Sequence, residues 1–105
     1  MDREVDTIAK KVSKILDRNN IDPDSKGGRA LLCCAVAACC DRKRSIGDLC
    51  AWYADFKQTN VWAVHANMAY ACRRAMSGHT PGELIKQVVG EVCQNEDGVS
   101  VTERG

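Results

Sequence analysis

The sequence predicts an all-α fold, a compact bundle of five to six helices that contains a helix-turn-helix. Apolar residues recur along most of the chain with the three- and four-residue spacing of amphipathic helices. No segment shows the alternation of apolar and polar residues that is typical of a half-buried strand. Of the 105 residues, 45% are hydrophobic and 28% are charged, which suits one domain with one core. We therefore expect a single helical domain over residues 1–94 and a polar C-terminal tail over residues 95–105.

The N-terminal part of the chain predicts two helices joined by a turn. One apolar stripe marks the first helix: Val5, Ile8, Val12, Ile15 and Leu16. This helix ends at Asn19 and Asn20, and a Pro-Asp turn follows over residues 21–25. The second helix begins near residues 26–29 and runs through Cys40. Because its stretch ALLCCAVAACC is apolar all round, we expect it at the centre of the bundle.

Two more helices follow, each with a signal at its start. Ser45, with Asp48 three residues later, resembles a capping box and opens the third helix. Its predicted apolar face consists of Ile46, Leu49, Cys50, Tyr53 and Phe56. Thr59 or Asn60 caps the fourth helix, which runs over about residues 61–76. Its predicted apolar stripe consists of Val61, Val64, Met68, Ala71, Cys72 and Ala75.

The last helix has the clearest start signal in the sequence. Thr80 is the expected N-cap, Pro81 takes the first helical position, and Glu83 completes a T-x-x-E capping box. Apolar residues at helical spacing continue from Leu84 to Cys93, where we expect the helix to end.

The seven cysteines are expected to be reduced core residues. Four of them lie in the apolar stretch of the second helix, and no C-x-x-C spacing occurs anywhere. An odd number of cysteines also fits a disulfide framework badly, whereas free cysteine is among the most buried residue types. This usage indicates a reducing compartment, and we predict a cytoplasmic location.

Composition and motifs exclude several classes of function. The chain holds 15 Lys plus Arg against 14 Asp plus Glu, a net charge of +1. Any attraction to nucleic acid or to an acidic membrane therefore has to come from a local patch of charge. Its longest apolar run is too short for a membrane-spanning helix, and the charged N-terminus does not resemble a signal peptide. The sequence has no Walker A loop, G-x-G-x-x-G, H-E-x-x-H or G-x-S-x-G motif. We therefore expect no enzymatic activity, no cofactor and no metal site.

The pair of helices over about residues 45–76 has the layout of a helix-turn-helix. A short helix, a tight connection and a longer helix form the arrangement in which the second helix enters the major groove of DNA. Helical bundles in general contain such pairs, so this pattern alone also fits an ordinary bundle.

Several anchors follow in the order found in one known family. Residues 21–23 form a short I-x-P turn, and residues 26–31 match a helix that begins K-G-x-x-x-L. Residues 67–72 resemble an A-I-x-x-A-I-like run at the end of a recognition helix, and residues 83–93 give a final amphipathic helix. Over about residues 8–93, the chain thus resembles the C-terminal effector domain of the sporulation response regulator family (stage-zero sporulation protein A). The resemblance implies a six-helix DNA-binding domain of a transcription regulator that binds its site as a tandem dimer.

The chain departs from this family in two respects. We expect it to stand alone, without the phosphoacceptor receiver domain of the family. The recognition helix of the family is rich in arginine, reading roughly S-R-V-E-R-A-I-R, whereas residues 62–69 here read WAVHANMA. Because arginine contacts to guanine edges are the commonest specific readout, the obvious base-reading chemistry is missing.

Two functions from different classes follow from these observations. The first is a DNA-binding regulator domain whose partner is double-stranded DNA. Its candidate recognition residues are Asn60, Trp62, His65, Ala66, Asn67, Tyr70 and Arg73. Its candidate phosphate contacts are Lys26, Arg29 and Lys57. The second is a protein–protein interaction module that keeps the fold and contacts a second copy or a related regulator through the Ala/Trp/Tyr face.

Overall fold

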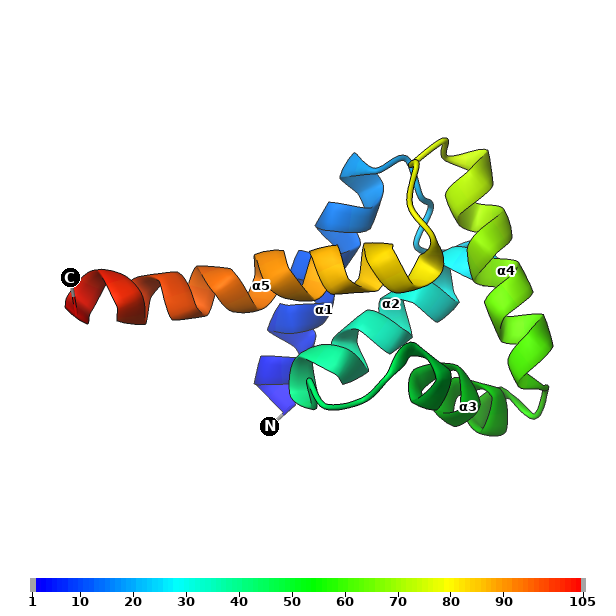
Figure 1. The fold of residues 1–105 in the computed structure, drawn as a ribbon, viewed down its shortest axis with the longest axis horizontal. Helices are drawn as coiled ribbons and strands as arrows, with labels where there is room; N and C mark the ends of the chain where they lie inside the picture. The colour runs from blue at the N-terminus through cyan, green and yellow to red at the C-terminus, as the bar shows by residue number, and fades with distance from the viewer. Residues whose placement is uncertain (1, 105) are drawn as a thin grey trace.

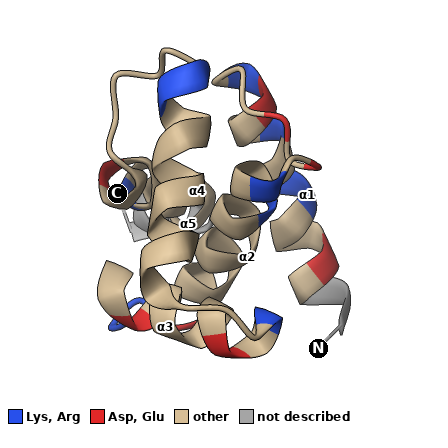
Figure 2. Cartoon of the chain, turned by 90° about the vertical axis from the view of Figure 1, so that its right-hand side faces the viewer, with Lys and Arg blue, Asp and Glu red and all other residues tan. Residues whose placement is uncertain are grey.

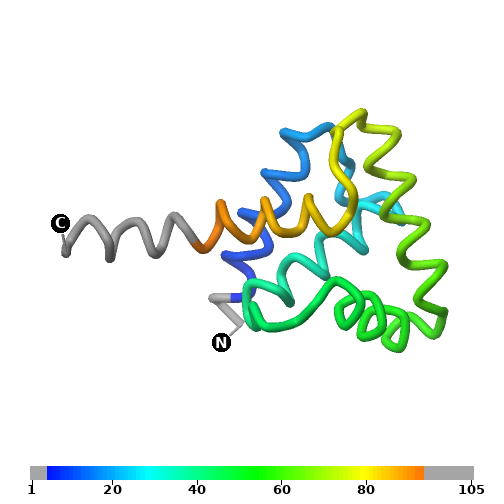
Figure 3. Tube along the Cα trace, viewed as in Figure 1, coloured from blue at the N-terminus to red at the C-terminus, as the bar shows by residue number. Residues whose placement is uncertain are grey.

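Over residues 2–104, the computed structural model of the chain consists of five helices, which Figure 1 shows in order. They are α1 (Asp2–Arg18), α2 (Lys26–Cys40), α3 (Ile46–Lys57), α4 (Val61–Arg74) and α5 (Pro81–Arg104). The structure describes the side chains of residues 5–93, the coloured part of the trace in Figure 3. No strand occurs in residues 2–104, so the predicted all-α fold is confirmed.

α2 lies at the centre of the bundle, because it packs against each of the other four helices. Leu31 and Cys34 on this helix are fully buried. α2 is not buried on every side, however. Cys33 and Val36 are half-buried and Cys40 is exposed, and these residues share one stripe of the helix. Four neighbours thus cover only part of the circumference of α2.

Side-chain caps fix the starts of the helices as the sequence predicts. Ser45 and Asp48 form a reciprocal capping box at the start of α3. At the start of α5, the Thr80 Oγ1 accepts a hydrogen bond from the Glu83 N–H, and the Glu83 carboxylate accepts one from the Thr80 N–H. Of the two caps considered for α4, Asn60 is the one used, since its Oδ1 accepts a hydrogen bond from the Ala63 N–H at 2.9 Å.

The burial predicted for the apolar stripes is wrong at the ends of three helices. Val5, Phe56 and Val61 were expected on buried faces, but all three side chains are exposed. Each of the three lies in the first or the last turn of its helix. α4 also ends earlier than predicted, at Arg74, and Met76 has a left-handed φ of 55° and is exposed.

α5 is longer than the sequence predicts, since its backbone continues from the expected end at Cys93 to Arg104. The polar tail expected over residues 95–105 lies outside the residues whose side chains are described. Among the described residues, no helix combines the length and the apolar character that crossing a lipid bilayer requires.

A glycine lets α4 approach α2 closely. A Cβ atom added at Gly27 would lie 2.1 Å from the main-chain oxygen of Asn67 and 2.8 Å from the Cβ of Ala71. The backbones of the two helices are therefore close to contact at this point, which only glycine permits. This contact fixes the position of α4 relative to the start of α2.

Candidate nucleic-acid interface

After its first residue, the exposed Val61, α4 divides into an inward stripe and an outward face. Val64, Met68 and Cys72 are buried against the core. The exposed residues on the outward face are Trp62, His65, Ala66, Tyr70, Arg73 and Arg74. Asn67 is half-buried between the two. Of the seven predicted recognition residues, the structure thus exposes Trp62, His65, Ala66, Tyr70 and Arg73 on one helix face.

The turn before α4 is built by local hydrogen bonds. Gln58 takes a left-handed conformation with a φ of 55° and ends α3, and the Thr59 N–H donates to the carbonyl of Ala54 at 2.8 Å. Asn60 is exposed, but its side chain caps α4 and so is already engaged. In Figure 1, α3 is seen nearly end-on while α4 runs along the plane of the view, so the two helices cross steeply. The helix-turn-helix assignment of this pair stays a prediction.

A groove of about 560 Å³ runs between the C-terminal half of α4 and the turn that leads into α2. Lys26 from α2 lines it together with Asn67, Tyr70 and Arg74 from α4, and the exposed Asp22 lines it from the turn before α2. The Arg74 Nη1 donates a hydrogen bond to the Tyr70 hydroxyl at 3.3 Å, and its guanidinium lies 5.9 Å from the centroid of that ring. The structure therefore brings one predicted phosphate contact, Lys26, to two predicted recognition residues. Arg74 was not among the predicted site residues.

Trp62 and His65 lie at the other end of α4. They line a smaller cleft of about 250 Å³ together with residues at the start of α3, among them Ile46 and Cys50. The Trp62 side chain is 86% exposed, so the cleft covers little of it. Four of the predicted recognition residues thus line two separate hollows, Asn67 and Tyr70 in one and Trp62 and His65 in the other. The other three, Asn60, Ala66 and Arg73, line neither.

The other two predicted phosphate contacts do not line the Lys26 groove. The Arg29 guanidinium forms an ion pair with Asp24 at 3.2 Å, and the Lys57 ammonium lies 5.9 Å from the centroid of the Phe56 ring. Burial raises the pKa of the Cys33 thiol overall, and the charges of Arg29 and Lys57 oppose part of that rise.

α4 presents no acidic side chain to a polyanion. Its sequence from Val61 to Arg74 contains no Asp or Glu, and its only charged residues are Arg73 and Arg74 in the last turn. Figure 2 shows this helix in tan along nearly its whole length, with blue at its end and at the start of α2 beside it. Because α4 carries no acid, it does not repel the phosphates of DNA. Its positive charge lies at its C-terminal end, where it is suited to contact phosphates rather than bases.

The sequence pattern did not predict an aromatic cluster on α3, which consists of Trp52 and Phe56. The rings of Trp52 and Phe56 stack with an interplanar angle of 8° and a centroid distance of 6.3 Å, and Phe56 is 68% exposed. The Arg44 guanidinium lies 6.0 Å from the centroid of the Trp52 ring. The four-residue spacing of the two aromatics was the available signal, but Phe56 was assigned to the buried face.

All seven cysteines are free thiols. Four are buried, Cys33 and Cys39 are half-buried, and Cys40 is exposed, so the prediction of core cysteines holds for the four buried ones. Within the part of the chain that the structure describes, no three His, Cys, Asp or Glu residues gather in a way that would hold a metal ion.

The thiols should differ widely in reactivity. Burial raises the pKa of both Cys34 and Cys39 to about 12, whereas Cys40 is exposed. The thiolate is the nucleophile, so at about pH 8.5 iodoacetamide should alkylate Cys34 and Cys39 roughly 100-fold more slowly than Cys40 in the folded protein. Peptide mass spectrometry over time measures the order, and urea-unfolded protein is the control in which the rates should converge. Equal rates in the folded protein would contradict the burial described above.

Comparisons with protein-family models, with curated proteins and with solved structures found no match to this chain. The resemblance to the sporulation effector domain therefore stays a prediction from the sequence.

Proposed function

We propose that this chain binds double-stranded DNA through the outward face of α4. The observation that carries the proposal is the combination of an exposed helix without acidic residues and a cationic border. Lys26 and Arg74 line one groove with Asn67 and Tyr70, and Arg73 is exposed on the same helix. Asp22 also lines this groove, so its two cations outnumber its one acid. The resemblance to a DNA-binding effector domain supports the same assignment to the same helix.

The phosphate contacts and the base contacts come from different residues in this proposal. Lys26, Arg73 and Arg74 contact the backbone of the duplex, which positions α4 in the major groove. Trp62 and Ala66 on the outward face are apolar and suit the methyl group of thymine. Asn67 supplies the amide that pairs with an adenine edge. Contacts to the base edges are weaker without arginine, so the contacts to phosphates supply most of the affinity for DNA.

The experiment is a fluorescence-anisotropy titration of a labelled duplex across a series of salt concentrations. The wild-type chain should bind at low salt and weaken steeply as salt rises, because counterions are released from each contacted phosphate. The double variant Lys26→Glu/Arg74→Glu should lose at least about tenfold in affinity and reduce the salt slope by about 2.

The matched control is Lys10→Glu/Lys14→Glu, which makes the same change of charge at two exposed positions on α1. This control should bind nearly as tightly as the wild type, apart from the weak effect of net charge. If both double variants lose the same affinity, the binding is unspecific electrostatic attraction. If the wild type does not bind at low salt, the proposal is wrong.

Protein binding through the same face is the second candidate, and the 86% exposure of Trp62 favours it. Large exposed aromatics are enriched at the centres of protein interfaces. If a second copy covers this face, light scattering on a sizing column should show a dimer, and Trp62→Ala should convert it to a monomer. A monomer at all concentrations would exclude this form of the second candidate.

A further inference from the structure

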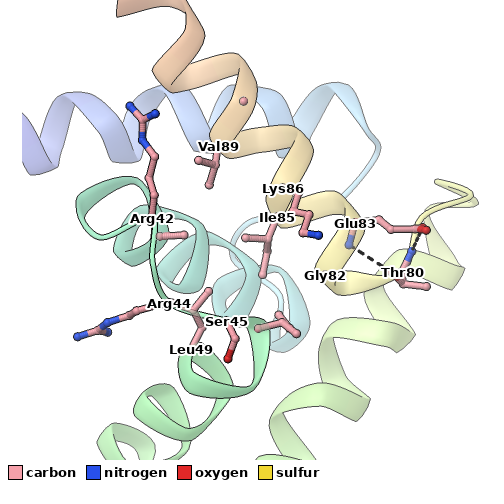
Figure 4. A pocket seen from close by; sticks show the side chains of 13 residues that line it. Arg42, Arg44, Ser45, Leu49, Thr80, Gly82, Glu83, Ile85, Lys86 and Val89 are labelled. Carbon is pink, nitrogen blue, oxygen red and sulfur yellow. Dashed lines mark hydrogen bonds between the residues drawn. The ribbon is translucent and has the colours of Figure 1, made fainter. Parts of the chain in front are cut away.

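A groove of about 670 Å³ lies away from α4, between the end of α2, the start of α3 and α5. Its described lining residues come from these three helices and from the segments that precede α3 and α5, and Figure 4 shows them from close by. The volume lies in the range of pockets that bury small ligands. Nothing proposed above for DNA uses this groove.

The floor of the groove is apolar. Ala38 from α2, Ile46 and Leu49 from α3, and Ile85 and Val89 from α5 line it. In Figure 4, the side chains of Ile85 and Val89 point from α5 toward the side on which Leu49 lies. Ile46 and Val89 are only partly buried, so apolar surface stays accessible to a ligand. Covering that surface favours an apolar body.

The rims carry cations. Figure 4 shows Arg42 standing at the edge opposite α5 and Lys86 on α5, while the guanidinium of Arg44 is directed away from the groove. The Glu83 carboxylate also lies on the rim, but it accepts a hydrogen bond from the Thr80 N–H at 3.0 Å as part of the cap of α5. The nearest acid of α3, Asp48, is held in the capping box with Ser45. Arg42 and Lys86 thus bring positive charge to the groove from two sides, while the Glu83 carboxylate keeps its negative charge within the cap of α5.

Ser45 adds a hydrogen-bond donor at the mouth of the groove. Its Oγ accepts a hydrogen bond from the Asp48 N–H at 3.1 Å, which leaves the hydroxyl proton to donate. A ligand oxygen is a suitable acceptor for it. The polar groups at the rim therefore favour a negatively charged head group, and the floor favours an apolar body.

We propose that this groove binds a small amphipathic anion, an acyl- or alkyl-chain molecule with one carboxylate or phosphate head. The chain lies on the accessible apolar surface of Ile46 and Val89, above the buried Leu49 and Ile85. The head group lies at the rim, within reach of Arg42, Lys86 and the Ser45 hydroxyl. An acidic peptide shares the charge, but a docked protein segment needs an extended surface of several hundred Å² on each partner, whereas this hollow has the volume of a small-molecule pocket.

The test is a titration followed by amide chemical shifts in ¹⁵N–¹H spectra of the full chain. Decanoate, below the concentration at which it forms micelles, should shift the amide signals of Gly82 and Gly90, which line the groove on α5. Decyl phosphate is the second probe, and the tighter of the two identifies the head group. Decyltrimethylammonium carries the same chain with a cationic head and should bind at least about tenfold more weakly.

Gly90 provides a steric block that leaves the core intact. A Cβ added there would meet no atom within 4 Å, so larger side chains fit on the helix and enter the groove. Gly90→Leu should abolish the decanoate shifts at Gly82, whereas Gly90→Ala should keep them. Both variants should stay folded by circular dichroism, because Ala and Leu favour helix over Gly.

Lys86 tests the charge at the rim. Lys86→Gln should weaken decanoate binding about threefold, and Lys14→Gln, the same change on α1, should leave it unchanged. The proposal is overturned if decanoate and decyl phosphate shift no groove amide, if the cationic probe binds equally, or if Gly90→Leu binds like Gly90→Ala. It is also overturned if only an acidic peptide shifts these amides.

Discussion

Replacing Gly27 with alanine should destabilise the protein by about 3 kcal/mol or more. Alanine favours helix over glycine by about 1 kcal/mol, so helix propensity alone predicts a more stable protein. The added methyl group would lie 2.1 Å from the main-chain oxygen of Asn67, which belongs to a helix backbone that cannot rotate away. α2 and α4 would have to separate, and the packing between them would be lost along much of their length.

Gly90→Ala is the matched control for this substitution. Gly90 also lies inside a helix, but an added Cβ there meets no atom within 4 Å. This variant should gain about 0.5–1 kcal/mol, so the two identical changes are expected to have opposite signs. Urea unfolding followed by circular dichroism measures both. A gain in stability for Gly27→Ala would show that α4 does not approach α2 as closely as described.

Truncation of Leu31 should cost about 3 kcal/mol. Leu31 is 0% exposed and lies on the helix that all four others contact, so its loss leaves a cavity bordered by rigid neighbours. A domain of this size has a stability of about 5–10 kcal/mol, so Leu31→Ala removes a large share of it.

Leu32 is the control for Leu31, because it is the next residue on the same helix and is only half-buried. Leu32→Ala should cost about 1 kcal/mol or less, since solvent already reaches its side chain. Urea midpoints of the two variants, measured with unchanged slopes, give the comparison. Equal losses of stability would contradict the placement of Leu31 inside the core and Leu32 at its edge.

The features that the sequence predicts best are those with local causes. The caps at Ser45, Asn60 and Thr80 depend on atoms within three residues of each other, so short patterns identify them. The inward stripe of α4, Val64, Met68 and Cys72, follows from helical spacing alone. The all-α fold follows from the same spacing in every segment.

The features that the sequence missed depend on contacts between distant segments. Lys26 and Asn67 line one groove because α2 and α4 touch at Gly27, and no pattern within either segment specifies that contact. The sequence identified α4 as the candidate helix, but it could not show that Lys26 lines the groove beside α4 while Arg29 and Lys57 do not.

The division of α4 into two stripes has a consequence for protein engineering. The buried residues of α4 hold the helix in place, and the exposed residues form a separate set. The exposed residues should therefore tolerate substitution without loss of the fold. Positions 62, 66 and 70 are exposed, and their side chains carry no part of the core. A library that varies only these three positions would sample new binding specificities on a constant fold. The close contact at Gly27 would keep α4 in the same position relative to α2.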